Sequence, residues 1–397
     1  MRLSLPGRPA AAAQAAQDAQ GGHDAQGAQG AQDRQDDDAR GVTPRWWQRG
    51  RGPVRDLWIG GVLIVIVIGF SVASPYFLTQ ANWLNTSSTA TEVLLLAVGE
   101  TFVICTGGID LSVGAVLGFS GMAGAWVMAH WFAVTSGPDL LSVAVGFLAA
   151  VVAGGAFGAV NGVLVARTPI PPLVVTLGTL GIATGLGNLL NNGQEISTIP
   201  GSVATFGNTN LGGWVPVPVL IAAVITAWCG IVLAKTRFGA YTLSIGDSRE
   251  SVIRAGIDDR RHLFKVYLIC GLLAGVAGVL VMARLGAGNP ASGSSDNLNA
   301  IAAVVIGGTS LFGGRGTIVG SVIGTLIIAV LVTGLVITNV PPFWQEVAVG
   351  VILILAVWID QLHLSGDRAR RRSHQAPGSA TPAFIPPSVT GRRNGHS

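Results

Sequence analysis

Long apolar segments separated by short polar connections occupy most of this chain. A helix that crosses a bilayer needs about 20 mainly apolar residues, and with its connection each crossing uses roughly 30. Residues 57–360 therefore accommodate about ten crossings, and the pattern predicts an all-α polytopic membrane protein with about ten transmembrane helices, some of them broken by glycine. The apolar runs are 57–76, 91–106, 111–130, 140–166, 172–190, 216–234, 264–286, 299–312, 317–336 and 344–361.

Charges in the connections predict which side of the membrane each connection faces. Lys and Arg are enriched in cytoplasmic loops, and here they gather in alternate connections, whereas the opposite set holds at most Arg284. Both termini are therefore expected to be cytoplasmic, which requires an even number of crossings. The basic residues are Arg167, Lys235, Arg237, Arg249, Arg254, Arg260, Arg261, Lys265, Arg315, Arg368, Arg370, Arg371 and Arg372.

The polar ends of the chain are expected to lie outside the bilayer. Residues 1–56 begin with an Ala, Gln, Gly and Asp-rich stretch that cannot bury enough apolar surface to offset chain entropy, and they end in a basic, aromatic approach to the membrane. We expect a disordered cytoplasmic tail there and another over 362–397. The transmembrane domain between them, 57–361, has its longest cytoplasmic loop at 235–263.

Composition agrees with a membrane protein. Only 11% of the residues are charged, against about a quarter in soluble domains. Cys105, Cys229 and Cys270 lie inside apolar runs and are interpreted as small buried hydrophobes. The net charge of +4 does not indicate nucleic-acid binding, because the basic residues are not clustered with aromatic ones. We expect the chain to contact membrane lipid and not to bind nucleic acid.

No catalytic or metal-binding pattern is visible. The two lysines, Lys235 and Lys265, do not end a glycine-rich phosphate loop. There is no His-Glu-x-x-His, no Gly-x-Ser-x-Gly and no cluster of His, Asp and Cys. We therefore expect a chain that is not an enzyme and holds no cofactor or metal of its own.

Two glycine-interrupted segments, 106–112 and 307–317, are candidate sites. Glycine pairs break helices, and broken backbone at membrane depth is tolerated only where protein or a water-filled path surrounds it. The polar residues that follow could cap the next helix or line a solute path, and both hypotheses stay open. The candidate residues are Glu100, Thr106, Gly107, Gly108, Asp110, Ser112, Gly307, Gly308, Thr309 and Ser310. The two segments resemble each other weakly, which hints at an internal duplication.

Glu100 is a second acid that the pattern places inside an apolar run. An ionisable residue at that depth is costly and by default marks function, although a hydrogen bond to a neighbouring helix would also satisfy it. One hypothesis for the whole chain is an ion-coupled secondary transporter in which Glu100 and Asp110 carry protons.

A short helix is predicted over 247–256. Asp247 or Ser248 caps its start, Glu250 complements its amino end and Gly256 stops it. The apolar Val252 and Ile253 among these charges suit docking into a groove on a partner, and an ordinary solvated loop helix is the alternative.

The motifs together resemble the inner-membrane permease subunits of bacterial ABC importers for monosaccharides, in the ribose-type branch. The likeness covers about 300 residues, from the first apolar run to the last. The stretches that match the family are residues 99–104 followed by 107–114, 161–162 with 171–178, 236–239, 301–311 with 313–317, and 343–345.

This resemblance implies a permease for ribose or a related pentose or hexose in the bacterial cytoplasmic (inner) membrane. It implies three partners: a second permease subunit, an ABC ATP-binding subunit that holds ATP and Mg, and an extracytoplasmic sugar-binding protein. The loop 235–263 would be the coupling loop, and its helix would transmit ATP-driven closure. The residues so implied are Asp247, Ser248, Arg249, Glu250, Val252, Ile253, Arg254 and Gly256.

The coupling segment departs from the family pattern. The family usually has Gly-Gly-Asn and then Ala-Ala-Arg-Leu-Ser-Gly-Ile, whereas here Gly246-Asp247-Ser248 precedes the string 251–257, Ser-Val-Ile-Arg-Ala-Gly-Ile. Ile253 thus occupies the usual arginine position, and Arg254 lies about 100° further around the helix. A cognate ATPase subunit is expected for this reason.

Overall fold

The computed structural model describes the backbone of residues 53–135 and 139–374, and side chains over 59–131 and 139–358. The predicted disorder of 1–52 and of 375–397 lies outside the described residues. The helices and strands are α2 (Pro53–Ala73), α3 (Gln80–Cys105), α4 (Val113–Thr135), α5 (Asp139–Arg167), α6 (Pro172–Leu189), α7 (Gly201–Asn208), β1 (Asn210–Leu211), β2 (Val215–Pro216), α8 (Val217–Lys235), α9 (Arg237–Asp247), α10 (Arg249–Arg254), α11 (Asp259–Leu285), α12 (Asp296–Ile306), α13 (Ile318–Ile337) and α14 (Pro342–His374).

The first and last of these helices extend beyond the predicted transmembrane domain. α2 already begins at Pro53, and α14 continues to His374, so parts of both predicted tails are helical. Proline is favoured in the first turn of a helix, where its missing N–H costs nothing.

Seven helices in the described part of the chain are long and apolar enough to cross a membrane: α3, α4, α5, α6, α8, α11 and α13. Each of the ten predicted apolar runs coincides with a helix, and within the residues whose side chains are described the apolar stretches of α2, α12 and α14 are Ile59–Ala73, Asp296–Ile306 and Pro342–Trp358. The clearest difference is the run 299–312. It was expected to be a crossing, but α12 ends at Ile306, and its 11 residues cover about 16 Å, roughly half the hydrocarbon thickness.

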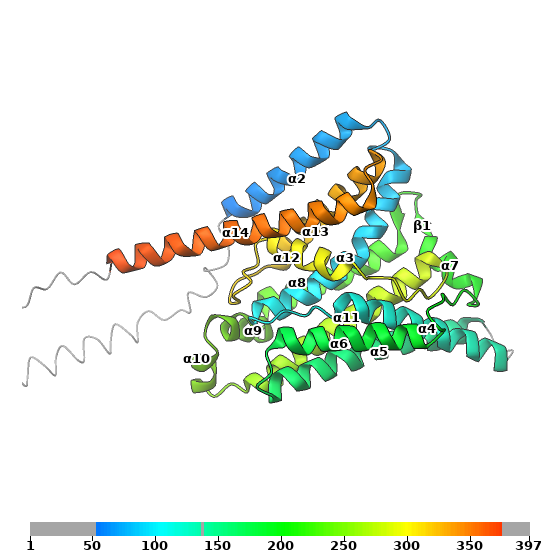
Figure 1. The fold of residues 1–397 in the computed structure, drawn as a ribbon, viewed down its shortest axis with the longest axis horizontal. Coiled ribbons are helices and arrows are strands. Elements are labelled where there is room, and N and C mark those ends of the chain that lie inside the picture. The colour runs from blue at the N-terminus through cyan, green and yellow to red at the C-terminus, as the bar shows by residue number, and fades with distance from the viewer. Residues whose placement is uncertain (1–52, 136–138, 375–397) are drawn as a thin grey trace, which may run out of the picture. The chain divides into compact units, whose positions relative to one another are not determined.

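α11 lies inside the bundle and packs against α3, α4 and α5 (Figure 1). Its closest neighbour is α5, because glycines face each other across the two helices. A Cβ added to Gly158 would lie 2.9 Å from the Cα of Gly271, and one added to Gly154 would lie 2.6 Å from the Cα of Gly275. Small residues four apart allow membrane helices to approach backbone to backbone, so this interface tolerates no larger side chain.

The two glycine-broken segments begin with the same helix ending. Gly107 has a φ of +84°, and the next residue, Gly108, donates its N–H to the carbonyl of Val103. Gly308 has a φ of +82°, and Thr309 donates its N–H to the carbonyl of Val304. This is the Schellman arrangement, which needs a residue in the left-handed region and so favours glycine. The weak likeness of the two strings therefore extends to the backbone.

α12 begins inside the bundle, beside the start of α4. Residues 286–295 before it are irregular, and the carbonyls of Ser292 and Gly293 lie so close to Gly118 and Gly114 that a Cβ on either α4 glycine would collide with them. Residues 286–295 and α12 together therefore form a broken helix, with irregular backbone followed by regular helix.

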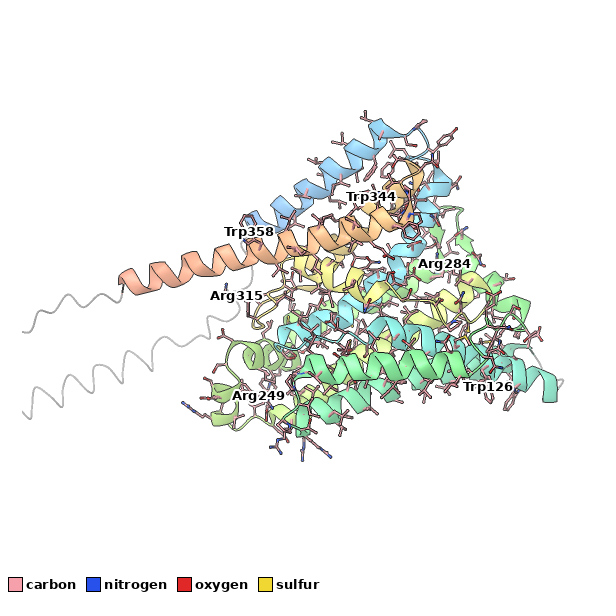
Figure 2. The ribbon with its side chains drawn as sticks, viewed as in Figure 1. Trp126, Arg249, Arg284, Arg315, Trp344 and Trp358 are labelled. Atoms are coloured by element: carbon pink, nitrogen blue, oxygen red, sulfur yellow. The ribbon has the colours of Figure 1, made fainter. Side chains whose placement is uncertain are left out.

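The loop 235–263 contains more structure than the single predicted helix. Thr236 caps α9 by accepting the N–H of Gly239, α10 follows directly, and α11 already starts at Asp259. α9 and α10 lie at one end of the bundle, whereas α7 and β1 lie at the opposite end (Figure 1). The start of α2 and the end of α14 are at the α10 end. Figure 2 shows Arg249 and Arg315 at this same end and Arg284 toward the other.

Candidate functional site

Three backbone segments meet beside the start of α10. Gly314 donates its N–H to the carbonyl of Cys105 at 3.0 Å, which joins the ends of the two broken segments. Gly246 is wedged between them, because a Cβ there would collide with that same carbonyl and with the N–H of Gly314. A Cβ on Gly313 would lie 2.9 Å from the Cα of Gly246 and from the amide nitrogen of Gly107. Movement of the α9–α10 connection would therefore press directly on both breaks.

The connection 107–112 is irregular, yet its polar backbone groups find side-chain partners on three helices. Asp110 donates its N–H to Oε1 of Glu100 on α3 at 3.0 Å. Thr176 on α6 donates to the carbonyl of Ile109 at 3.2 Å, and Asn297 on α12 donates to the carbonyl of Leu111 at 3.4 Å. Unpaired backbone groups cost several kcal/mol in hydrocarbon, so these side chains stabilise the break.

Asp110 accepts hydrogen bonds from Ser112, the residue that precedes α4, so its predicted role as a cap of α4 stays a prediction. Its Oδ1 accepts the N–H and the hydroxyl of Ser112 ahead of α4, and Asn161 on α5 lies 3.4 Å from its Oδ2. Asn161 also donates to the Ser112 hydroxyl oxygen at 2.9 Å. Asp110, Ser112, Asn161 and Glu100 are all at most 2% exposed. In this structure these candidates for the solute path are enclosed within the subunit.

The second break is also enclosed. Thr309 and Ser310 are buried, and Thr309 packs against Gly316, whose added Cβ would lie 2.9 Å from the Thr309 hydroxyl oxygen. Gly307 lies against Gly320 of α13, and a Cβ on either would collide with the other's carbonyl. Thr317 caps α13 by accepting the N–H of Gly320.

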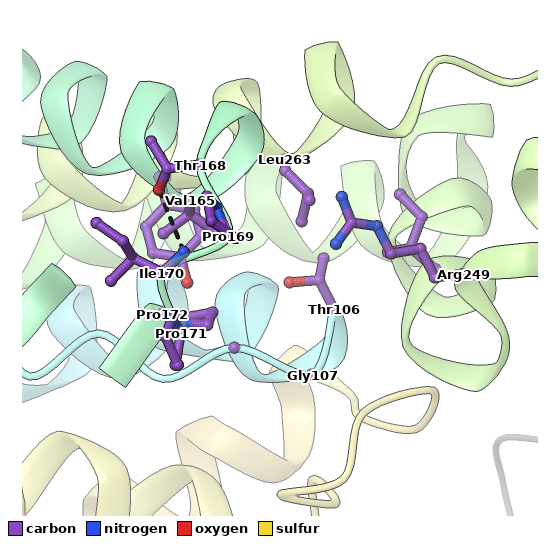
Figure 3. Close-up of a pocket in the computed structure, with 13 residues that line it drawn as sticks. Thr106, Gly107, Val165, Thr168, Pro169, Ile170, Pro171, Pro172, Arg249 and Leu263 are labelled. Carbon is purple, nitrogen blue, oxygen red and sulfur yellow. Dashed lines mark hydrogen bonds between the residues drawn. The ribbon is translucent and has the colours of Figure 1, made fainter. Parts of the chain in front are cut away.

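A pocket of about 320 Å³ opens beside the first break. Figure 3 shows the Thr106 hydroxyl and the Arg249 guanidinium facing this space across from the connection between α5 and α6. Its lining residues are Thr106, Gly107, Gly108, Val165, Thr168, Pro169, Ile170, Pro171, Pro172, Ile245, Arg249, Leu263 and Tyr267. The pocket therefore lies between α10 and the backbone of the first break.

α10 has the predicted signals at both ends. Ser248, rather than Asp247, is the N-cap and accepts the N–H of Ser251. Gly256 follows the helix with a φ of +78° and donates its N–H to the carbonyl of Ile253. Glu250 lies in the first turn and pairs with Arg254 at 3.0 Å on the exposed surface.

Val252 does not face outward as the docking interpretation required. It is 4% exposed and packs with Ala166, Ile245 and Leu263, whereas Ile253 is 51% exposed. Successive residues of a helix point about 100° apart, so one of the pair faces the subunit and the other faces away. Val252 therefore attaches the helix to its own subunit, where Arg249 adds an ion pair with Asp259 at 2.7 Å.

Several residues of this site had no specific role predicted from their sequence context. Tyr267, Thr176, Asn297 and Ser321 meet the breaks only through tertiary packing, and Ser321 lies 2.7 Å from the hydroxyl of Thr101. The only feature of the sequence that could have pointed to these four residues is a polar side chain in or next to an apolar run.

Fold and site together define a polytopic helical membrane protein with broken helices. Two short helices, α9 and α10, lie at one end of its bundle. Residues 82–357 match the family described as the permease component of the branched-chain amino acid transport system, and the chain belongs to that family. No solved structure matches the chain.

Three curated relatives are sugar permeases. The chain is 37% identical to the D-allose transport system permease protein of Escherichia coli over 76% of its length and 90% of the relative's. It is 37% identical to the ribose import permease protein of Bacillus subtilis, over 75% of this chain and 90% of the relative. It is 35% identical to the fructose import permease protein of Rhizobium meliloti, over 76% of this chain and 83% of the relative. The resemblance to sugar permeases is thereby confirmed.

Proposed function

We propose that this chain is the membrane permease subunit of an ATP-driven importer that takes up a monosaccharide, ribose or a related pentose or hexose. The observation that carries the proposal is its 33–37% identity, over most of its length, to permeases named for ribose, allose, arabinose and fructose. This supports the importer over an ion-coupled secondary transporter.

The same relationship supports a set of partner chains. ATP and Mg would be bound by a separate ATP-binding subunit, and an extracytoplasmic binding protein would deliver the sugar. A second permease subunit would complete the membrane part, and the assembly would lie in the bacterial cytoplasmic membrane.

We propose ten crossings, with both ends of the chain cytoplasmic. The start of α2 and the end of α14 lie at the α10 end, as an even number of crossings requires. The irregular residues 286–295 and α12 would together make one crossing, and α4 with the connection 107–112 before it would make another. Arg249 and Arg315 at the α10 end agree with the enrichment of basic residues in cytoplasmic loops.

Coupling to ATP hydrolysis is assigned to the exposed side of α10. Ile253 would contact the ATPase subunit, and Arg254 and Glu250 would surround that contact. Because Gly246 touches both breaks, a displacement of α9 and α10 would reach α3 and the loop before α13 without a long relay. Glu100, Asp110 and Ser112 would hold the first break in place as positioning residues.

Reconstituted transport tests this proposal. The chain would be co-expressed with candidate ATPase and sugar-binding partners, purified under mild conditions and placed in vesicles with labelled sugar. Uptake that requires ATP inside and the binding protein outside is expected. Uptake by this chain alone under a proton gradient, unaffected by ATP, would instead establish the ion-coupled alternative.

A further inference from the structure

The end of the bundle opposite α10 contains a buried ion pair. Arg284, in the last turn of α11, donates from Nη2 to Oε1 and Oε2 of Glu92 on α3 at 3.0 and 3.1 Å. Its Nη1 lies 3.4 Å from the hydroxyl oxygen of Thr89. Glu92 is 8% exposed, and both helices are long and apolar enough to cross a membrane. Ionisable residues within such helices are costly and by default mark function.

A second acid lies close to the same cation. Asp296, the first residue of α12, interacts electrostatically with both Arg284 and Glu92. Among the residues whose side chains are described, no Lys, Arg or His forms an ion pair with Asp296, and only Arg284 pairs with Glu92. An arginine is always protonated, so its burial requires a carboxylate partner. Arg284 therefore has two alternative partners, which lie on two different helices.

α7 packs directly on the backbone of this arginine. A Cβ on Gly207 would collide with the carbonyl of Ala283 and with the amide nitrogen of Arg284. The Asn208 side chain also donates to the carbonyl of Arg284 at 3.0 Å. Other residues of α7, such as Thr205, are exposed. Because close-packed contacts transmit displacement rather than absorb it, a movement of α7 would displace the end of α11 and with it Arg284.

The two acids lie on the helices that lead into the two breaks. Glu92 is on α3, which ends at the first break, and Asp296 is on α12, which ends at the second. Irregular residues 286–295 separate Arg284 from Asp296, and such segments can absorb changes in φ and ψ. A change of partner at Arg284 would therefore shift α12 relative to α3.

We propose that Arg284 is a positioning residue for transport, which pairs with Glu92 in this structure and with Asp296 when a sugar-loaded binding protein docks on α7. The inference rests on the proposed importer function. A buried ion pair adds little net stability compared with apolar side chains. Here its role is to define two discrete arrangements of α3 and α12, so that docking at one end of the bundle reaches both breaks.

ATP hydrolysis by the reconstituted complex, with and without sugar-loaded binding protein, tests the inference. Asp296→Asn keeps the pair seen here but removes the second partner. Stimulation by the binding protein should therefore fall by about tenfold, a typical strength of coupling between two sites, while the basal rate and the thermal midpoint stay at wild-type values. Glu92→Gln leaves Asp296 as the only partner, so the basal rate without binding protein should rise.

Two further variants serve as controls. Arg284→Lys keeps the positive charge and should retain part of the stimulation. Glu195→Gln replaces an exposed acid that follows α6 and should behave as the wild type. A purely structural ion pair would lower the thermal midpoint of Glu92→Gln without changing either ATPase rate.

The inference and the proposed function fail in different ways. A wild-type complex that the binding protein stimulates, together with Asp296→Asn and Glu92→Gln complexes that keep both wild-type rates, would overturn the inference alone. A wild-type complex that takes up no sugar and shows no stimulation would overturn the proposed function and this inference with it.

Discussion

At the residue scale, Asp110 shows how a single side chain stabilises broken backbone inside a membrane domain. Its carboxylate accepts hydrogen bonds from Ser112, and its own N–H is bonded to Glu100. Without these partners the connection between α3 and α4 would leave polar backbone groups unpaired in an apolar interior, which is costly.

Replacing Asp110 with Ala should therefore destabilise the folded chain by about 1–3 kcal/mol, because the buried donors of Ser112 lose their acceptor. A lowered thermal midpoint of the purified protein is the expected result. Asp139→Ala, at an exposed position, is the control and should change the midpoint little. An Asp110→Ala chain that folds normally and binds the ATPase subunit, yet does not transport, would place Asp110 on the solute path instead.

Val252 and Ile253 should respond in opposite ways to the same substitution. Val252→Asp places a charge among Ala166, Ile245 and Leu263 and should lower stability, because burying an unpaired charge is strongly unfavourable. Ile253→Asp changes an exposed side chain, so the chain should fold and insert normally but lose the ATPase subunit. Thermal unfolding and co-purification measure the two effects. Full ATPase recovery with Ile253→Asp would remove α10 from the coupling role.

At the scale of elements, close helix packing depends on glycines that an added methyl group would disturb. The α5–α11 contact and the meeting point at Gly246 are both of this kind. Interiors at this density tolerate little extra volume.

Gly158→Ala should cost about 1–3 kcal/mol, since the new methyl group meets the backbone of α11 and overpacking has costs of this size. Gly69→Ala on α2 is the matched control, because nothing lies within 4 Å of a Cβ there. Alanine's higher helix propensity should leave that variant neutral or more stable by up to about 1 kcal/mol. Equal thermal midpoints for the two variants would contradict the packing argument.

Gly246→Ala should separate ATPase binding from transport. The added methyl group must displace the carbonyl of Cys105 or the loop at Gly314, while the exposed side of α10 is unchanged. We expect the ATPase subunit to co-purify normally and the number of sugars transported per ATP to fall. Gly230→Ala is the control, since its Cβ would have an ordinary contact of 3.8 Å with Ile318. Normal transport by Gly246→Ala would show that displacement does not pass through this junction.

At the scale of the whole molecule, the two ends of the bundle differ. α9 and α10 form one end, and α7 with the short hairpin of β1 and β2 forms the other. A chain with this arrangement has a definite orientation in the membrane, which basic connections set during insertion.

Thiol labelling can measure that orientation directly. The native cysteines Cys105, Cys229 and Cys270 are buried, so they should contribute little background. A membrane-impermeant thiol reagent should label Ser251→Cys on α10 only in inside-out vesicles and Thr205→Cys on α7 only in right-side-out vesicles. Labelling of both cysteines from the same side would refute the proposed topology.

The sequence alone determined where the helices lie and how several of them end. Apolar runs of suitable length produced ten helices, because a backbone in hydrocarbon must satisfy its own hydrogen bonds. Local signals were equally reliable at α10, where Ser248 and Gly256 act within one or two turns of the chain. The family resemblance followed from short strings that include the breaks.

Tertiary structure decided which residues the breaks bring together. Nothing local indicates that Thr176 and Asn297 bond to the 107–112 connection, that Gly246 touches both breaks, or that Val252 faces inward while Ile253 faces outward. Likewise α12 is short because residues 286–295 replace helix with irregular backbone packed on α4. These features depend on contacts between residues far apart in the chain, and an apolar pattern records neither which side chains pack inside the bundle nor what they pack against.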